Sequence, residues 1–302
     1  MHDIIIVGAG PAGLTAAIYA LRADKKVLLI EKDTFGGQIT FSPKVENIPG
    51  FEAVSGNEFA DKLLEQALSQ GADIHPAKVT EVKDNGKTKT VITDDGEVFE
   101  AKAVIIAVGV CHRMPGLDGE DALVGNGISF CAVCDGAFYK DKTVAVMGGG
   151  NSALQEAILL SDTAKKVYVV QDLEKFTGEA RLVENLTSRE NVECMMGSSV
   201  TGLLSEDGLL TGITVSSSGV ERRLDVDGMF VAIGLIPENG VFEHLAGLDA
   251  RGYFDSGEDC RTMTEGVFVA GDCRSKKVRQ VTTACADGAV AAIAACEFID
   301  RM

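Results

Sequence analysis

The sequence has too few basic residues for a protein that binds nucleic acid. It contains 28 lysines and arginines against 45 aspartates and glutamates, a formal net charge of −17 at pH 7. A negative charge of this size repels phosphate backbones and anionic membrane surfaces over long range. We therefore expect neither nucleic acid nor a membrane surface as a partner, although a local patch can still dock an acidic protein.

Long apolar runs and a basic leader are also missing. The chain begins MHDIIIVGAG, and no stretch approaches the ~18 uncharged apolar residues that a membrane-spanning helix needs. We therefore expect a cytoplasmic protein whose eight cysteines are mostly reduced. With 302 residues, 46% of them apolar, the chain is long enough for one large or two ordinary α/β domains.

Residues 4–31 have the pattern of a strand, a glycine turn, a helix and a second strand that ends in an acid. Gly8, Gly10 and Gly13 are spaced as Gly-x-Gly-x-x-Gly. The first glycine permits a tight turn, the second lets backbone amides approach a pyrophosphate, and the third lets helix and strand pack closely. Glu31 ends the second strand, where a carboxylate can accept hydrogen bonds from an adenosine ribose. This context favours a dinucleotide site over a simple tight turn.

The same pattern returns in residues 143–171, offset by 140 positions. Gly148 and Gly150 take the places of the first two glycines, and Ala153 takes the place of the third. The repeat predicts an α/β chain with two Rossmann-like domains of the FAD/NAD(P) ββα type.

The end of the chain is expected to return to the first domain. A last apolar strand at 266–272 and a small-residue helix near 281–300 find their partners most naturally there. We therefore expect a discontinuous first domain, residues 1–113 and 246–302, with the second domain, residues 114–245, inserted into it.

Cys131 and Cys134 form a Cys-x-x-Cys that is followed by Asp135. Such a pair can be half a zinc site, a structural crosslink or a redox couple. Zinc and iron–sulfur sites need further ligands, but no second cysteine pair exists and the 4 histidines are scattered. A structural disulfide would close too small a loop to restrict the unfolded chain much. The redox couple is favoured, because one thiolate must attack and a tethered second must resolve the mixed disulfide. We expect no metal.

The chain resembles the low-molecular-weight flavin thioredoxin reductases over essentially its whole length. The motifs GAGPAG, GGQI, ENIPGF, CAVCDG, GGGNSA, VAIGLIPEN and GDCRSKKVRQVTTACADGA occur in that family's order. The resemblance implies a homodimeric FAD enzyme. It would pass two electrons from a donor through the flavin to the Cys-x-x-Cys and then to a thioredoxin-like disulfide. The discontinuous domain would bind FAD, and the inserted NAD(P)H-type domain would carry the cysteines.

The resemblance also implies which residues contact the flavin. Asp272 follows a strand, where a ribityl hydroxyl needs an acceptor. The residues that open the last helix would face the pyrimidine edge with backbone amides, which favours the anionic reduced form. Two polar residues in loops would donate hydrogen bonds to the flavin. The residues that open the last helix are Arg279, Gln280 and Val281, and the two polar loop residues are Gln38 and Asn47.

Three residues of the CAVCDG motif take catalytic roles by the same resemblance. Cys134 would lie against the flavin and receive the electrons, as the charge-transfer thiolate. Cys131 would be the interchange thiol that attacks the protein substrate. Asp135 would be the acid/base for the departing thiol, with its pKa raised by burial; its alternative role is to cap the next turn.

The sequence departs from the family where NADPH-using members hold the 2′-phosphate. Those members carry a His-Arg-Arg run and a further arginine after the second strand of the inserted domain. Here Gln171, Asp172 and Glu174 follow that strand, so a phosphate would meet carboxylates instead of guanidinium groups. Arg181 is isolated, and Lys175 lies next to Glu174. We therefore expect weak or absent use of NADPH.

Other electron donors remain open. NADH would suit the site if the Asp172 carboxylate accepted hydrogen bonds from the ribose hydroxyl groups. This requires the second strand of the inserted domain to end one residue later than we expect. Ferredoxin, used by related enzymes that lack the nicotinamide motif, is favoured narrowly. Its acidic surface could dock on a basic patch, which is equally well explained as a solvated loop with flavin contacts. A flavoprotein that carries electrons or senses redox state is the alternative from another class. The patch consists of Arg274, Lys276, Lys277 and Arg279.

Overall fold

Two compact units make up the computed structural model, which describes residues 1–42 and 45–302. The first unit consists of Met1–Cys111 and Ile236–Met302, and the second of His112–Leu235. The chain passes between them at β7 (Cys111–His112) and β16 (Leu235–Ile236), which form a two-stranded sheet.

The second boundary lies earlier in the sequence than the expected one at 245/246. Residues 236–245 belong to the first unit, because Phe242 and Leu245 are buried in its core beside Phe254. They lie in η3 (Gly240–Phe242) and α7 (Glu243–Ala246).

The first unit is built on a seven-stranded sheet of order β3-β2-β1-β6-β5-β4, in which β17 also pairs with β6. The central strands are parallel, and β4 and β5 extend the sheet in antiparallel fashion. β1 is buried from Ile4 onward, as a central parallel strand should be. The strands are β1 (His2–Val7), β2 (Val27–Glu31), β3 (Asp73–Pro76), β4 (Val79–Asp84), β5 (Lys89–Thr93), β6 (Val98–Ile106) and β17 (Val267–Val269).

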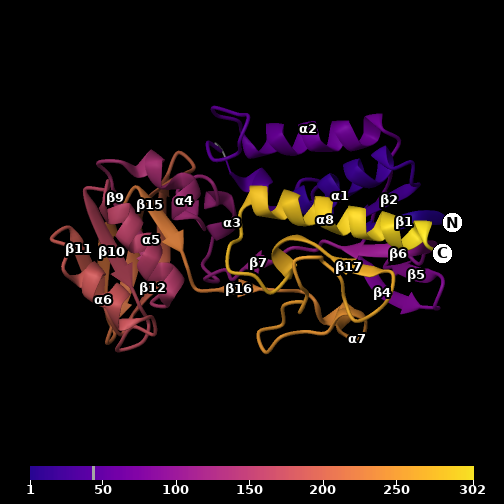
Figure 1. The fold of residues 1–302 in the computed structure, drawn as a ribbon. Coiled ribbons are helices and arrows are strands. Elements are labelled where there is room, and N and C mark those ends of the chain that lie inside the picture. The colour runs from indigo at the N-terminus through magenta and orange to yellow at the C-terminus, as the bar shows by residue number, and fades with distance from the viewer. Residues whose placement is uncertain (43–44) are drawn as a thin grey trace. The chain divides into compact units, whose positions relative to one another are not determined.

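Helices α1 (Pro11–Arg22), α2 (Gly56–Ser69) and α8 (Val281–Asp300) lie together in the first unit (Figure 1). α1 and α8 approach closely because Gly288 has no side chain: a Cβ there would lie 2.1 Å from the Ala12 carbonyl oxygen. The expected helix near 281–300 is therefore confirmed. Short 3-10 turns, η1 (Gly37–Phe41) and η4 (Gly271–Cys273), connect these elements to the sheet.

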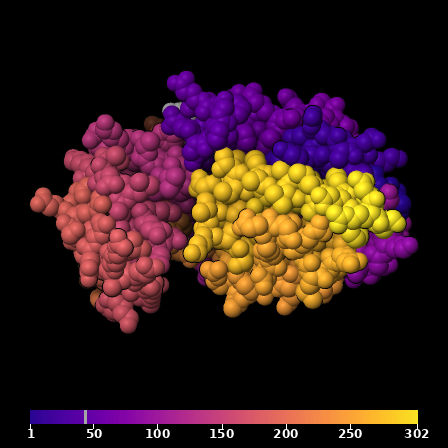
Figure 2. All heavy atoms as spheres, viewed as in Figure 1, coloured from indigo at the N-terminus to yellow at the C-terminus, as the bar shows by residue number. Residues whose placement is uncertain are grey.

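Within the described residues, α8 is the one helix long and apolar enough to cross a membrane. Ala291 and Ala295 are buried in the core of the first unit, whereas Ile293 is 50% exposed. Figure 2 shows the yellow atoms of this helix at the surface of that unit. A core helix with one exposed stripe passes the same test, so α8 is weak evidence for a membrane span.

The second unit has a parallel sheet of order β11-β10-β9-β15-β8. Two separate core clusters use alternate residues of this sheet, one with the helices and one with an antiparallel three-stranded sheet. The parallel strands are β8 (Ile128–Ser129), β9 (Thr143–Met147), β10 (Lys166–Val170), β11 (Val192–Met195) and β15 (Gly228–Val231). The remaining elements are α3 (Glu120–Leu123), α4 (Ala132–Asp135), η2 (Gly136–Tyr139), α5 (Asn151–Ser161), α6 (Ala180–Thr187), β12 (Ser198–Glu206), β13 (Leu209–Ser217) and β14 (Val220–Asp225).

The two glycine-turn regions repeat each other in strand register. Val7 of β1 pairs with Ile30 of β2, and Met147 of β9 pairs with Val170 of β10. The residue that follows is Glu31 in the first unit and Gln171 in the second. The predicted α/β architecture with a repeated β-α-β turn is thus confirmed.

Candidate functional site

The first glycine turn is a backbone arrangement that side chains would destroy. Gly8 has a φ of +100°, and a Cβ on it would lie 2.4 Å from the Ala107 carbonyl oxygen. A Cβ on Gly13 would lie 1.9 Å from the Gly8 carbonyl oxygen. α1 begins at Pro11 directly after Gly10, so its N-terminus opens at the turn. This geometry opens a helix N-terminus at the turn, where a pyrophosphate can be bound, and the role expected for the three glycines stays a prediction.

Glu31 is fixed beside this turn by backbone amides. Its Oε2 accepts a hydrogen bond from the Ala9 amide at 2.7 Å, and its Oε1 accepts one from the Asp33 amide at 2.9 Å. The carboxylate is thus held at the end of β2 and retains lone pairs for further donors. These contacts fit a carboxylate that receives ribose hydroxyl groups.

Asp272, in η4, has a buried acceptor without a donor. Its Oδ1 has no hydrogen-bond partner among the residues that the structure describes, and burial raises the pKa of the carboxyl. Lys276 Nζ lies 3.9 Å from this oxygen, beyond hydrogen-bond distance, so the buried acceptor can still take a hydrogen-bond donor. A ribityl hydroxyl of FAD is a donor of the required kind, so the glycine cradle and this carboxylate together fit the cofactor.

Four of the remaining residues expected at the flavin, Asn47, Arg279, Gln280 and Val281, lie at or contact the start of α8. Gln280 is the N-cap of this helix, which begins at Val281, and its Oε1 accepts a hydrogen bond from Asn47 Nδ2 at 3.1 Å. The Arg279 side chain donates to the Asp272 carbonyl oxygen and lies 4.3 Å from the centre of the Tyr253 ring. Arg279 therefore braces the loop with its side chain.

Gln38 is exposed in η1, and among the residues that the structure describes no hydrogen bond joins it to Asn47 or Gln280. Its expected bond to the flavin remains a prediction.

A buried ion-pair network holds the Asp272 loop and was not predicted from the sequence. Asp287 of α8 pairs with Arg274 at 2.8 Å and with Lys276 at 2.9 Å, and it accepts a hydrogen bond from the Gly271 amide at 3.0 Å. An acid in the middle of an otherwise small-residue, apolar helix was the available signal.

This network corrects our interpretation of the basic patch. Arg274 is 5% exposed and Lys276 is largely buried, and both pair with Asp287, while Arg279 donates to backbone carbonyls. Lys277 is the exposed member of the four. Because three of the four cations are already engaged inside the first unit, the patch is not a free docking surface.

The two cysteines of the second unit are joined in a disulfide, with their Cα atoms 5.3 Å apart. Cys131 is the N-cap of the single-turn helix α4, and its Sγ accepts a hydrogen bond from the Cys134 amide at 3.2 Å. Such a bond favours a thiolate at Cys131 once the disulfide is reduced. Val133, between the two cysteines, is 63% exposed.

Asp135 is connected to the cysteine pair through Ser129. The Ser129 hydroxyl donates to Asp135 Oδ2 at 2.6 Å and accepts from the Cys131 amide at 3.2 Å. Asp135 Oδ1 is buried and has no partner in the described part of the chain, and burial raises the pKa of the carboxyl. The expected acid/base residue is therefore beside the pair, in a state that favours holding a proton. Ser129, two residues before Cys131, was not predicted.

The other cysteines do not suggest further redox pairs. The six that remain are free thiols. Cys273 is fully buried, and burial raises its pKa to about 12, so a reactive thiolate there is disfavoured. Burial also raises the pKa of Cys111 and Cys285.

The second glycine turn has the same backbone as the first but different residues beside it. Gly148 has a φ of +128°, and α5 begins at Asn151 after Gly150. Gln171 takes the place of Glu31. It is 5% exposed, and its Cδ lies 2.5 Å from where a Cβ of Gly149 would be. β10 ends at Val170, so the later strand end that would have brought Asp172 to the ribose is not found.

A segment of the second unit folds against the start of α5. The amides of Thr177 and Gly178 donate to the Gly149 carbonyl oxygen, at 2.9 and 3.1 Å. The Glu179 carboxylate accepts from Asn151 Nδ2 at 3.0 Å, and Asn151 Oδ1 accepts from the Glu179 amide at 2.7 Å. A phosphate at this helix N-terminus would therefore lie close to the Glu179 carboxylate.

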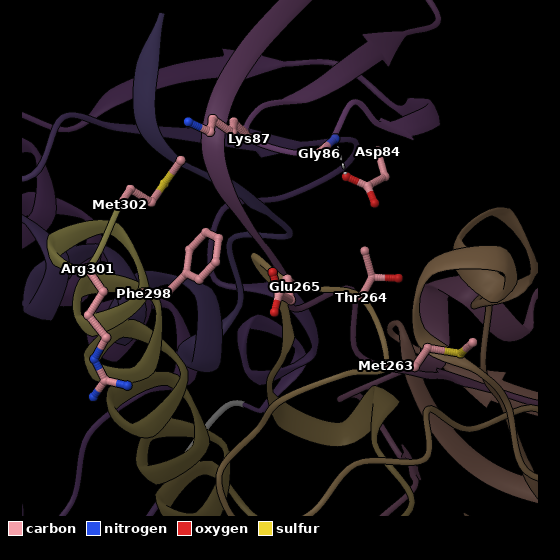
Figure 3. Close-up of a pocket in the computed structure, with 9 residues that line it drawn as sticks. All are labelled: Asp84, Gly86, Lys87, Met263, Thr264, Glu265, Phe298, Arg301 and Met302. Atoms are coloured by element: carbon pink, nitrogen blue, oxygen red, sulfur yellow. Dashed lines mark hydrogen bonds between the residues drawn. The ribbon is translucent and has the colours of Figure 1, made fainter.

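One cavity of about 630 Å³ lies in the first unit, apart from these features. Figure 3 shows Phe298, Glu265 and Thr264 around it, with Arg301 and Met302 from the end of the chain. None of its described lining residues is a predicted site residue, so the cavity does not support a role in the chemistry.

Comparisons with known proteins agree with this geometry. The family model for pyridine nucleotide-disulphide oxidoreductases matches residues 2–288. The thioredoxin reductases of Listeria monocytogenes and Bacillus subtilis are 39% and 38% identical to the chain, cover 100% of it, and are themselves covered to 95% and 96%. The chain belongs to the low-molecular-weight thioredoxin reductase family. The structure of thioredoxin reductase from Streptococcus pyogenes is similar too, with a TM-score of 0.95, 35% identity, and coverage of 100% and 99%.

Membership in this family makes the chain an FAD-dependent oxidoreductase of the disulfide reductase type. The expected fold, cofactor and enzyme class are thus confirmed.

Proposed function

We propose that the chain reduces the disulfide of a thioredoxin-like protein through FAD and the Cys131–Cys134 pair, and that its electron donor is not NADPH. The observation that carries the first part is the disulfide at the exposed tip of α4, linked through Ser129 to the buried Asp135. When bound, FAD supplies an electron pair for this disulfide. The resemblance to the family leads us to propose a cytoplasmic homodimer.

The contacts support distinct roles for the two thiols. The amide of Cys134 stabilises a thiolate on Cys131, so Cys131 attacks the substrate disulfide and Cys134 resolves the mixed disulfide. Asp135 holds the proton that the departing thiolate of the substrate takes up. His112 is no rival acid, because burial lowers its pKa to about 4 and leaves the ring neutral.

The residues at the second glycine turn support a donor other than NADPH. A 2′-phosphate beyond Gln171 would meet Asp172 and Glu174, and a pyrophosphate at α5 would meet Glu179. The repulsion between the phosphate and several carboxylates in one site is stronger than the attraction that the isolated Arg181 can provide. NADH is also disfavoured, because its diphosphate would meet Glu179 too. We therefore favour ferredoxin, docked elsewhere than on the Arg274–Arg279 segment.

Single-turnover mixing with cysteine variants tests the thiol roles. The enzyme is reduced anaerobically with stoichiometric dithionite and mixed with an oxidised bacterial thioredoxin, and new thioredoxin thiols are counted. We expect Cys131→Ser to keep a reducible flavin yet form at least about a hundredfold fewer thiols per second. Cys194→Ser, a free thiol of the same unit, is the matched control and should leave the rate unchanged. Full activity in Cys131→Ser would overturn the role assigned to Cys131. Full activity in both Cys131→Ser and Cys134→Ser would indicate that the protein is an electron carrier or redox sensor instead.

A further inference from the structure

A buried glutamate that the roles above do not use lies beside the cysteine pair. Glu156 belongs to α5, and its carboxyl accepts a hydrogen bond from the backbone amide of Ala132, the residue that follows Cys131. α4 and α5 pack against each other, and Ala132 is 3% exposed. The bond therefore lies at the contact between α4 and α5, at the residue next to Cys131.

The Glu156 carboxyl is only partly satisfied. Its Oε2 is buried and finds no hydrogen-bond partner within residues 1–42 and 45–302. Burial raises its pKa from 4.5 to about 8, and the Ala132 amide opposes this rise. A carboxyl in this state changes its protonation readily when a charge appears nearby.

No charged neighbour fixes the protonation of Glu156. The described elements that pack against α5 carry few titratable groups, and none of these contributes to the change in the Glu156 pKa, which burial and the Ala132 amide alone produce. These groups are Asp135 on α4, Tyr139 on η2, Lys166 and Tyr168 on β10, and Arg181 and Glu184 on α6.

We propose that Glu156 is a positioning residue that couples proton uptake to reduction of the Cys131–Cys134 disulfide. The inference rests on the redox role proposed above for this pair. Reduction breaks the S–S bond and places two electrons, delivered by the flavin reductase activity, on the two sulfurs. Cys131 becomes a thiolate, Cys134 takes one proton from water to become a thiol when it is not in contact with the flavin, and an ionised Glu156 takes the second proton from water.

The coupling follows from like charges around one turn of the chain. The Glu156 carboxyl accepts from the Ala132 amide, which belongs to the peptide unit that follows Cys131, and the Cys131 sulfur accepts from the Cys134 amide of the same turn, so a thiolate and a carboxylate there are both anionic only at a cost. Protonated Glu156 removes this repulsion and leaves the Cys134 amide free to support the thiolate. Glu156 acts through Ala132 and needs no contact with the substrate.

Equilibration with dithiothreitol tests the proposal on the holoenzyme, without thioredoxin or a physiological donor. The disulfide and dithiol forms of the peptide containing Cys131 and Cys134 are trapped by alkylation and measured by mass spectrometry. Glu156→Gln keeps an oxygen for the Ala132 amide but cannot ionise. Near about pH 6 we expect the same equilibrium as for the unchanged chain, since both carry a neutral group there.

Near about pH 9 the two proteins should separate. If the thiolate raises the pKa of Glu156 by about one unit, Glu156→Gln should favour the dithiol about fivefold more than the unchanged chain does. Glu184→Gln removes an exposed carboxylate on α6 and is the matched control, with the same equilibrium as the unchanged chain at both pH values.

The outcomes separate this inference from the proposed function. Equal equilibria for Glu156→Gln and the unchanged chain at high pH would overturn the coupling alone. A pair that dithiothreitol does not reduce at all would overturn the redox role itself. If Glu156→Gln does not fold, reduced-minus-oxidised infrared spectra of the unchanged chain decide: a carboxylic acid band should grow on reduction near about pH 8, and its absence contradicts the proposal.

Discussion

The glycine turns of the two units share a backbone and their first two glycines but differ at the third position and at the residue that follows the second strand. In the first unit the third glycine is Gly13 and the strand ends in Glu31, bonded to the amide of the turn. In the second unit these positions hold Ala153 and the buried Gln171, and Glu179 lies at the start of the helix. The two units thus share the same backbone fold, and we expect nucleotide binding to depend on the few side chains beside each glycine turn.

The largest effect should come from the third position of the turn. Gly13→Ala places a methyl group 1.9 Å from the Gly8 carbonyl oxygen, where neither α1 nor β1 can move. We expect a cost of about 1–3 kcal/mol and loss of most bound FAD. Flavin absorbance per protein and the thermal unfolding midpoint measure both effects. Ala153→Gly is the matched change in the second unit and should leave the flavin content unaltered; equal losses would contradict the difference between the turns.

A smaller effect is expected at the acid that follows the second strand. Glu31→Gln should weaken FAD binding about tenfold, since a neutral amide accepts ribose hydroxyl groups less well and its single oxygen cannot accept from both the Ala9 and the Asp33 amides. Titration of the apoprotein with FAD measures the dissociation constant. Gln171→Glu creates the reverse exchange in the second unit, and a comparable loss of FAD affinity there would show that the two sites are not distinct.

The smallest effect concerns Asp272 and Asp135, two half-buried carboxylates that each have one buried oxygen. Burial raises the pKa of both above the ordinary value of 3.8, so each binds a proton more tightly in the folded state. The contribution of these two carboxyls to the stability of the apoprotein should therefore fall as the pH rises from about 4 and level off above their raised pKa values, whereas the contribution of Glu156, with a pKa raised to about 8, continues to fall to higher pH. Denaturation midpoints between about pH 4 and 7 measure this slope.

FAD should distinguish these two carboxylates. A ribityl hydroxyl that donates to Asp272 lowers the pKa of this group, so the bound cofactor should flatten the part of the slope that Asp272→Asn also removes. The part due to Asp135 should persist when FAD is bound. An unchanged slope after FAD addition would contradict the assignment of Asp272.

Sequence patterns predicted the features that depend on neighbours along the chain. Turns and helix ends are specified by a few neighbouring residues. The sequence therefore predicted the glycine turns, the start of α8 at Val281 and the pairing of Cys131 with Cys134. The roles of the site residues stay predictions, because they depend on contacts with a cofactor and a substrate.

Features that depend on distant contacts were missed. Asp287 forms ion pairs with Arg274 and Lys276, so residues that look like an exposed basic patch in the sequence belong to a buried network. Glu156 meets Ala132 only because α5 packs on α4, and residues 236–245 join the first unit through Phe242. Composition cannot reveal such pairings, because long-range packing decides which polar groups are buried together.

Anaerobic stopped-flow reduction of the flavin tests the central claim most directly. NADPH, NADH and reduced ferredoxin are offered separately to the holoenzyme, and bleaching of the oxidised flavin band near about 450 nm is followed. The contrast between the two turns predicts that ferredoxin bleaches the flavin at least about tenfold faster than either nucleotide. Rapid and complete bleaching by NADPH would show that the second turn binds this nucleotide despite its carboxylates, and would contradict the account.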